Sequence, residues 1–451
     1  MGELSDIFTQ GQRSRLFPVL ADTSKEGRTL SIFLACLENV EEFGTAMLSS
    51  LGQRVGTRAR IETYTEIVLK KGGERKHRPD GLIVLRAGSK RWMALVEAKV
   101  GNTDLTAEQV YTYLDLAKLN GIDTVLTISN QFAPLPTHHP VHLPASSRRK
   151  AELFHWSWMF VLTQASLLLS NDQVTDRDQR IILNEMVRFI THPSAGVKGF
   201  DQMPPHWSDV VGKVQAGARV LANSEDAKEV VGAWYQEVRD LNLILSRQLA
   251  IEVTTRIPRA HAADPAARLK AGTVELAQDH RLSATFIVPA AAAPMDICAD
   301  LQKRSVVISM KLRAPDERKS TKARVSWLLR QLQRTENNNN IHVRLFWPGR
   351  TAHTQHPLVA LRENVDLAVA DRPGQQVLSF EVLLVKDLGA KFGQRRNFIS
   401  ELEAAVPEFY EQIGQHLKAW QAPAPRLREN KADPSSVTAE AIREEAEQEV
   451  Q

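Results

Sequence analysis

Two acidic residues and one lysine are spaced in a way that could support chemistry. Asp80 precedes the apolar run 81–85, and Glu97 and Lys99 close a second apolar run that begins at 91. Gly88-Ser89 between these runs is typical of a two-residue hairpin turn with glycine first. Counting back from that turn places Asp80 opposite Glu97, with Cβ atoms about 4.5–5.5 Å apart. Lys99 lies on the same face as Glu97 because strand side chains alternate.

This arrangement predicts a site for a hard divalent cation. Two facing carboxylates repel each other unless a positive charge lies between them. Mg²⁺ suits such a site, because it takes one or two carboxylates and keeps waters that phosphate can replace; Mn²⁺ is an alternative. The ammonium of Lys99 could orient or help deprotonate a water and stabilise a pentacovalent phosphate. We therefore expect metal-assisted hydrolysis of a phosphodiester.

The elements that would position these residues read as an α/β domain. Three-or-four spacing of apolar residues predicts a helix over 30–51, and Gly52 follows it as a cap. A helix is also expected over 105–121, ended by Asn120-Gly121. Strands are expected over 61–70, 81–85, 91–99, 124–129 and 151–159, with a further helix over 160–169. This order predicts a mixed sheet flanked by helices.

The motif Pro79-Asp80, followed across a hairpin by Glu97-Ala98-Lys99, resembles the PD-(D/E)xK nuclease superfamily. The helices before and after the motif are in the order that this superfamily uses, and the resemblance covers roughly residues 30–170. It implies a restriction-endonuclease-like fold. It also implies Asp80 and Glu97 as metal ligands and Lys99 as the catalytic lysine.

The resemblance implies three further site residues. Members of the superfamily often add a glutamate from the first helix, and Glu42 is the best match, with Glu38 and Glu41 as competitors. Gln109 and Tyr113 resemble a Q-x-x-x-Y element found on the helix after the lysine strand in exonuclease-like branches. They are one helical turn apart, so both could face the site.

The rest of the chain carries no comparable motif. Residues 1–29 read as an N-terminal arm and 171–250 as a helical region. Residues 251–420 read as an α+β domain of unknown role, with strands expected over 251–258, 282–290, 305–314, 341–349 and 377–387 and helices over 322–334 and 396–417. Residues 421–451 have the composition of a disordered tail.

The charge of the chain is unevenly distributed. The 451 residues carry a net charge of +4, whereas residues 51–100 alone hold twelve Lys/Arg and five Asp/Glu, a net of +7. Such a concentration is a candidate footprint for a polyanion, and a solvated basic loop is the alternative. Contacts from these residues to phosphates would be independent of base sequence.

Composition excludes several classes of protein. Hydrophobic residues make up 43% of the chain and charged residues 24%, as in soluble globular proteins. No apolar run approaches the ~18–20 residues of a membrane span, and no secretory signal is recognisable. The two cysteines, Cys36 and Cys298, lack CxxC spacing, which argues against a disulfide scaffold and fits a reducing cytoplasm. No P-loop motif occurs, so any ATPase would be a separate partner.

These observations favour a Mg²⁺-dependent nuclease that acts on nucleic acid, with DNA preferred over RNA. Nucleases of this superfamily joined to an unrelated second domain resemble bacterial restriction or antiviral-defence effectors, and residues 251–420 could recognise a substrate, a partner or an oligomer mate. The alternative is a catalytically inactive nucleic-acid-binding or scaffold protein that keeps the nuclease fold.

Overall fold

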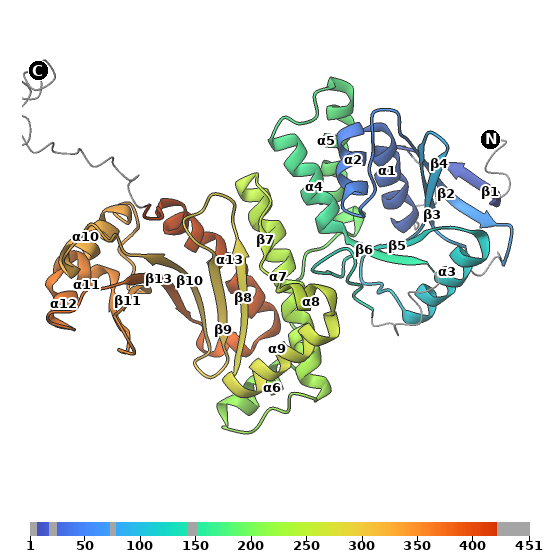
Figure 1. Ribbon diagram of the computed structural model, residues 1–451. Coiled ribbons are helices and arrows are strands. Elements are labelled where there is room, and N and C mark those ends of the chain that lie inside the picture. Colours follow the sequence, from blue (N-terminus) through green and yellow to red (C-terminus); the bar gives the residue numbers. More distant parts are fainter. Residues whose placement is uncertain (1–6, 18–24, 73–77, 142–150, 422–451) are drawn as a thin grey trace, which may run out of the picture.

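The protein contains two β-sheets, each packed against its own set of helices (Figure 1). The computed structural model describes residues 7–17, 25–72, 78–141 and 151–421. The tail expected over 421–451 falls, apart from its first residue, outside the described residues. None of the described helices is both long enough and apolar enough to cross a bilayer.

The first sheet contains, in the described residues, six strands that lie side by side in chain order. They are β1 (Phe8–Arg13), β2 (Arg60–Leu69), β3 (Gly81–Ala87), β4 (Lys90–Ala98), β5 (Thr124–Ser129) and β6 (Glu152–Ser157). Strands β1 to β4 pair antiparallel, whereas β4, β5 and β6 pair parallel. The expected α/β class with a mixed sheet is therefore confirmed.

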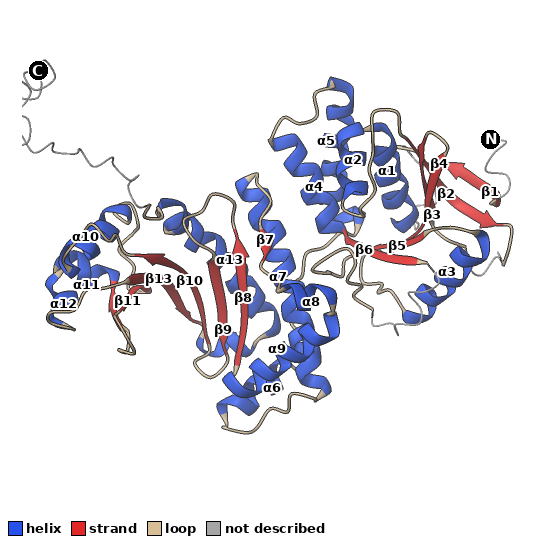
Figure 2. Cartoon of the chain, viewed as in Figure 1, coloured by secondary structure: helices blue, strands red, loops and turns tan. Residues whose placement is uncertain are grey.

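Helices cover both faces of this sheet (Figure 2). Helix α3 (Ala107–Asn120) packs on one face, where it meets Met93 and Leu95. The other face carries Ala94 and Val96. It is covered by α1 (Lys25–Asn39), α2 (Glu41–Ser49), α4 (Trp158–Ser170) and α5 (Arg177–Thr191). Strands buried on both faces explain the near-continuous apolar runs in the sequence.

Two expectations at the N-terminal end need correction. The helix expected over 30–51 is two helices, because the chain leaves helical geometry at Val40 (φ −115°, ψ 104°). Apolar spacing continues across this turn because both helices bury one side against the same core. The arm expected over 1–29 contains β1, which pairs with β2, and the start of α1. These described residues belong to the first sheet and its helices.

The second sheet is antiparallel, with its described strands in the order β12-β11-β13-β10-β9-β8-β7. Strand β7 is only Thr254–Thr255, much shorter than the strand expected over 251–258. Two strands escaped sequence reasoning, β9 (Met295–Asp300) and β12 (Thr354–Pro357). The remaining strands match expected ones: β8 (Arg281–Ile287), β10 (Ser305–Arg313), β11 (Ile341–Phe346) and β13 (Ser379–Asp387).

Helices pack against the second sheet and between the two sheets (Figure 1). Helices α10 (Thr321–Gln331) and α13 (Arg395–Gln412) match expected helices, and α6 (Trp207–Gln215) and α7 (Glu225–Leu249) lie in the helical region expected over 171–250. The others are α8 (Arg259–Ala263), α9 (Pro265–Asp279), α11 (Leu358–Glu363) and α12 (Asp366–Ala370).

Helix α7 joins the two halves of the molecule. Its Trp234 and Leu241 are buried in the core of the second sheet, whereas its Leu243 is buried in the core of the first. Arg247 of α7 donates a hydrogen bond of 2.6 Å to Thr163 of α4. One rigid helix thus contributes to both cores, so the halves are not connected by a simple linker.

The close packing of α2 on α1 predicts a strong effect of one methyl group. A Cβ atom at Gly44 would lie 2.5 Å from the carbonyl oxygen of Leu37, whereas a Cβ at Gly232 of α7 would meet no atom within 4 Å. We expect Gly44→Ala to lower the free energy of unfolding by about 1–3 kcal/mol. The matched Gly232→Ala should raise it by about 0.5–1 kcal/mol, because alanine favours helix. Urea unfolding of both variants measures this; equal effects would contradict the packing argument.

Candidate active site

The hairpin that carries the acidic residues has the register expected from the sequence. Gly81 pairs with Val96 and Ala87 with Lys90, so the two-residue turn is Gly88-Ser89, with Gly88 at φ 62°. One step beyond Gly81 and Val96 come Asp80 and Glu97, facing each other. An oxygen of Asp80 accepts a hydrogen bond of 2.9 Å from the Ala98 amide. The Asp80 carboxylate is thereby held at the end of β4.

Lys99 lies in the centre of the site. Its Nζ is 2.7 Å from Oε1 of Glu97 and 3.3 Å from Oε2 of Glu26. Glu97 is only 3% exposed and Lys99 only 8%, so this ion pair is largely shielded from water. The indole of Trp158 donates a hydrogen bond of 2.8 Å to the Lys99 carbonyl. That bond fixes the backbone of Lys99 just beyond β4.

The charges at the site shift the pKa values of its members. Burial, and after it the charge of Glu97, raise the pKa of Asp80 to about 8, although the Ala98 hydrogen bond and the charge of Lys99 oppose this shift. Burial lowers the pKa of Lys99, but the charges of Glu97, Asp80 and Glu26 outweigh burial, so the pKa is raised overall. Lys99 is consequently an ammonium at neutral pH, and Asp80 holds a proton more readily than an ordinary aspartate.

Of the two site residues expected on the helix after the lysine strand, Tyr113 lies at the site, whereas Gln109 caps the helix. Tyr113 is buried, and its hydroxyl lies beside the Glu97 carboxylate. Burial, and after it the charge of Glu97, raise the pKa of Tyr113. Gln109 instead forms a capping box with Thr106 at the start of α3. The backbone amide of Gln109 donates to Thr106 Oγ1 at 3.3 Å, and the Thr106 amide donates to the side-chain oxygen of Gln109 at 3.4 Å. No hydrogen bond in the described residues joins Gln109 to Asp80, Glu97 or Lys99.

The helix glutamate at the site is Glu26, and the expectation of Glu42 is corrected. Glu26 lies in the first turn of α1 and contacts Lys99, whereas Glu42 follows the other end of α1, ~20 Å away at 1.5 Å per helical residue. Glu38 accepts hydrogen bonds of 2.8 and 2.9 Å from the amide and hydroxyl of Thr63 and pairs with Arg13. Glu26 falls outside the apolar helix run, so the pattern contained no signal for it.

Strand β2 supports the site through an irregular residue. Glu66 has a left-handed backbone (φ 55°), which is strained for a residue with a side chain, and its amide donates to the Asp80 carbonyl at 3.2 Å. Its carboxylate pairs with Arg78 at 3.2 Å. Asp80 is therefore held through its backbone carbonyl by β2 and through its carboxylate by Ala98 of β4.

A row of polar residues beside Glu97 escaped sequence reasoning. Glu97 lies level with Thr127 of β5, which lies level with His155 of β6. The Nε2–H of His155 donates to the Gln131 carbonyl at 2.8 Å, so Nδ1 accepts the Thr127 hydroxyl, also at 2.8 Å. Burial lowers the pKa of His155 to about 3. This neutral, fully bonded imidazole holds the loop after β5 and is no acid or base for catalysis.

The loop after β5 carries three histidines, two of them in the described residues. His138 is buried, and its Nε2 donates to the Ala262 carbonyl at 2.8 Å. His139 contacts the Thr127 hydroxyl at 2.8 Å, and its ring lies 5.5 Å from that of His155, edge to face. His142 lies outside the described residues. The two described histidines therefore have structural partners.

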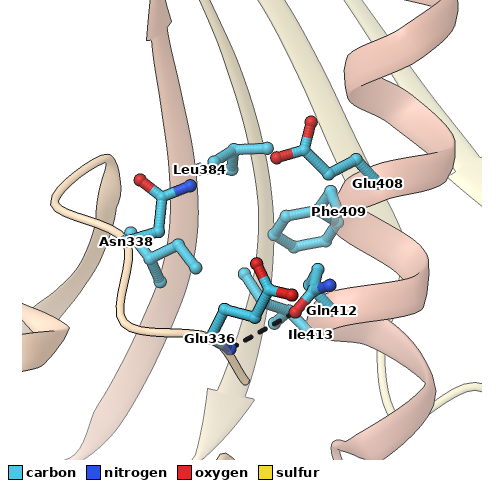
Figure 3. Close-up of a pocket in the computed structure, with 8 residues that line it drawn as sticks. Glu336, Asn338, Leu384, Glu408, Phe409, Gln412 and Ile413 are labelled. Atoms are coloured by element: carbon cyan, nitrogen blue, oxygen red, sulfur yellow. Dashed lines mark hydrogen bonds between the residues drawn. The ribbon is translucent and has the colours of Figure 1, made fainter.

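A hollow in the second half of the molecule is a weaker candidate (Figure 3). It encloses about 240 Å³, open solvent included, between the end of β13 and α13. The carboxylate of Glu408, which lines the hollow, already forms an ion pair with Lys386. Figure 3 shows the Glu336 amide joined to the side-chain oxygen of Gln412 by a hydrogen bond of 3.3 Å. The Asp80–Glu97–Lys99 cluster remains the stronger site.

The cluster suits a cation that needs few protein ligands. No group of three or more His, Cys, Asp or Glu side chains in the described residues forms a metal cage. Oε2 of Glu97 is nevertheless buried without a hydrogen-bond partner, close to the Asp80 carboxylate. Mg²⁺ is commonly held by one or two carboxylates, water and substrate phosphate. Asp80 and Glu97 fit that requirement, whereas they would not complete a structural zinc site.

The raised pKa of Asp80 predicts that stability without metal falls as pH rises. Between about pH 4 and pH 8 the folded protein keeps a proton that the unfolded chain releases, so unfolding becomes easier with rising pH. Asp80→Asn should reduce this loss between pH 5 and pH 8 by at least about 1 kcal/mol. Urea unfolding in EDTA measures it, with exposed Asp209→Asn as control. An unchanged pH dependence in Asp80→Asn would contradict the assignment.

Comparison with known proteins adds no further support. No family model matches this chain, and neither a curated protein nor a solved structure matches it. The case for a function therefore depends on the geometry of the site itself.

Proposed function

We propose that the protein is a Mg²⁺-dependent nuclease that hydrolyses phosphodiester bonds in DNA. The observation that carries the proposal is the buried ammonium of Lys99, 2.7 Å from Glu97, at the strand end where Asp80 faces Glu97. An opposed acidic pair with a fixed cation beside it matches the charge pattern of phosphodiester hydrolysis. An ion pair formed only to stabilise the fold would not require the second carboxylate, Asp80. The raised pKa of Asp80 shows that its ionised form is unfavourable in the folded protein.

Asp80 and Glu97 are the residues that would hold the metal. Bound there, Mg²⁺ would offset the repulsion between the two carboxylates and polarise a phosphoryl oxygen. The unpartnered Oε2 of Glu97 is an oxygen available to it. Mn²⁺ has the same preference for oxygen ligands.

Lys99 acts in this proposal as a fixed positive charge. Its raised pKa keeps the side chain protonated at neutral pH, which favours stabilisation of the charge that builds up on a phosphate over removal of a proton from water. Glu26 of α1 contacts Nζ at 3.3 Å. Tyr113, buried beside Glu97, excludes water from the same carboxylate.

The basic side chains around β2 support a nucleic acid as substrate. Exposed Arg54 and Arg58 precede β2, Arg60 begins it level with Arg86 near the hairpin turn, and Lys70 and Lys71 follow its other end. Such side chains bind phosphates without reading bases. We favour DNA over RNA and a role in bacterial restriction or antiviral defence by analogy alone, in a reducing cytoplasm that suits the free Cys36 and Cys298. A second copy or a separate ATPase could complete the system.

A catalytically inactive protein that binds nucleic acid is the second candidate. One observation favours it: Lys99 already pairs with both Glu97 and Glu26 without a metal. Such a site would be stable as a purely structural ion-pair network. Binding of DNA without Mg²⁺-dependent cleavage would select this candidate.

Removal of the Lys99 ammonium tests the nuclease directly. Lys99→Ala should reduce Mg²⁺-dependent cleavage of circular and linear DNA by about 10²–10³-fold, because one preorganised charge at the reacting phosphate is lost. Cleavage should require the divalent cation and stop in EDTA. The matched control is Lys118→Ala, which removes an exposed lysine of α3. Equal cleavage by wild type and Lys99→Ala would refute the assignment.

The position of the helix glutamate gives a second test. Glu26→Gln removes the charge that holds Lys99 and should lower the cleavage rate about tenfold, as expected for a partner that orients a reacting group. Glu42→Gln removes a glutamate that has no contact with the described site and should leave the rate unchanged. The rates are compared at saturating DNA and Mg²⁺. The reverse order of effects would show that the helix residue is wrongly assigned.

A further inference from the structure

A lysine from a distant part of the chain is fixed beside the candidate active site. Lys198 lies between α5 and α6, almost a hundred residues after Lys99, and its Nζ donates to Oδ1 of Asn102 at 2.5 Å. Asn102 follows Lys99 by three residues, so its Cα lies at most about 11 Å from the Cα of Lys99. The folded chain thus adds a second ammonium group near the end of β4.

The segment that carries this lysine is held rigidly by Asn130. The side-chain amide of Asn130 donates to the carbonyls of Gly101 and Gly196, at 3.0 and 2.9 Å, and its oxygen accepts from the Lys198 amide at 3.0 Å. The Gly101 amide also donates to the Gly196 carbonyl at 2.7 Å. One side chain therefore fastens residues 196–198 to the loop that follows Lys99.

The segment 195–200 is also held at both of its ends. The Ala195 carbonyl accepts a hydrogen bond of 3.2 Å from the hydroxyl of Thr29, which lies in α1 about one turn after Glu26. The Phe200 amide donates to Asp240 of α7 at 2.6 Å. Residues 195–200 thus run from the helix that holds Lys99 to the helix that joins the two sheets. A segment bonded at so many points presents its side chains in a defined position.

Lys198 keeps its charge available. No ion pair joins it to a carboxylate among the described residues, and its contact with Asn102 is to a neutral amide. Its side chain is exposed. In contrast, Lys228 of α7, an exposed lysine of the same type, pairs with Glu225 at 2.9 Å. An uncompensated, positioned ammonium beside a phosphodiester site is suited to a phosphate of an extended substrate.

We propose that Lys198, positioned by Asn130, binds a backbone phosphate one to a few nucleotides from the bond that is cut. This inference rests on the proposed nuclease function and specifies its substrate as a polynucleotide strand, since a mononucleotide or small diester would not reach Lys198. Lys198 is then a substrate-binding residue, and Asn130 is a positioning residue that acts through it.

Binding without cleavage is the first test. A short fluorescein-labelled DNA duplex is titrated in EDTA, with anisotropy as the readout and several KCl concentrations. Lys198→Ala should weaken binding about fivefold and reduce the slope of log affinity against log salt by about 0.9, the value for one phosphate contact on duplex DNA. Lys198→Arg should restore both values, and Lys228→Ala should change neither. An unchanged salt slope in Lys198→Ala would overturn the inference.

Cleavage of two substrates separates this inference from the proposed function. With Mg²⁺, Lys198→Ala should raise KM for the duplex and leave hydrolysis of bis(p-nitrophenyl) phosphate unchanged, whereas Lys99→Ala should strongly reduce both reactions. Equal losses on both substrates would overturn the role of Lys198. A wild-type protein that binds the duplex through Lys198 and cuts neither substrate would refute the nuclease and leave the phosphate contact standing.

A double-mutant cycle tests the role of Asn130. If Asn130 acts by placing Lys198, Asn130→Ala should weaken duplex binding in the wild type but add little in the Lys198→Ala background. Additive losses would show that Asn130 serves another purpose. The free energies of unfolding of all four proteins are measured alongside, so that a general loss of folding is recognised.

Discussion

The ion pair between Lys99 and Glu97 is the interaction on which the rest of the site depends. Both side chains are almost fully shielded from water, and burying two charges costs several kcal/mol for each unless each finds partners. Lys99 meets this need with two glutamates and the Ala98 carbonyl. Glu97 meets it only in part, because one of its oxygens has no hydrogen-bond partner. Removing the lysine would leave two acidic groups facing each other in a dry environment.

The register of the hairpin explains why Asp80 and Glu97 meet at one end of the strands. A hairpin with a two-residue turn sets the register, so the only freedom left to Asp80 and Glu97 is side-chain rotation. The Ala98 amide and the strained Glu66 then hold Asp80 from its two sides. The left-handed backbone of Glu66 costs of the order of 1–3 kcal/mol, which surrounding contacts must offset.

Sequence reasoning could predict this part of the structure because it depends on local rules. Glycine in the first turn position and the alternation of side chains are enough to place Asp80 opposite Glu97. Glu26 could not be found in this way, because its contact with Lys99 joins residues 73 positions apart and the helix start lies outside the apolar run. The same applies to Val40, where an uninterrupted apolar pattern conceals a turn, and to Gln109, whose capping role is equally compatible with its sequence position.

The second half of the chain shows the limits of sequence reasoning more strongly. Strand β9 mixes buried and exposed residues with two aspartates, and β12 contains histidine and proline, so neither resembles an apolar strand. Both strands form because each pairs with a neighbour that does have the pattern, β10 for β9 and β11 for β12. Tertiary context decides such elements, which is the general weakness of β-propensity.

Helix α7 connects the packing of the two halves with the position of the candidate site. Its Gln236 accepts the Phe132 amide at 3.1 Å and its Asp240 accepts the Phe200 amide at 2.6 Å, one turn apart on the same face. These two amides belong to the segments that Asn130 fastens to the loop after Lys99. A displacement of α7 relative to β5 would therefore move both segments, and with them Lys198, without altering the hairpin that holds Asp80 and Glu97. Substrate binding and the arrangement of acidic residues thus rest on separate sets of hydrogen bonds, even though both converge at the end of β4.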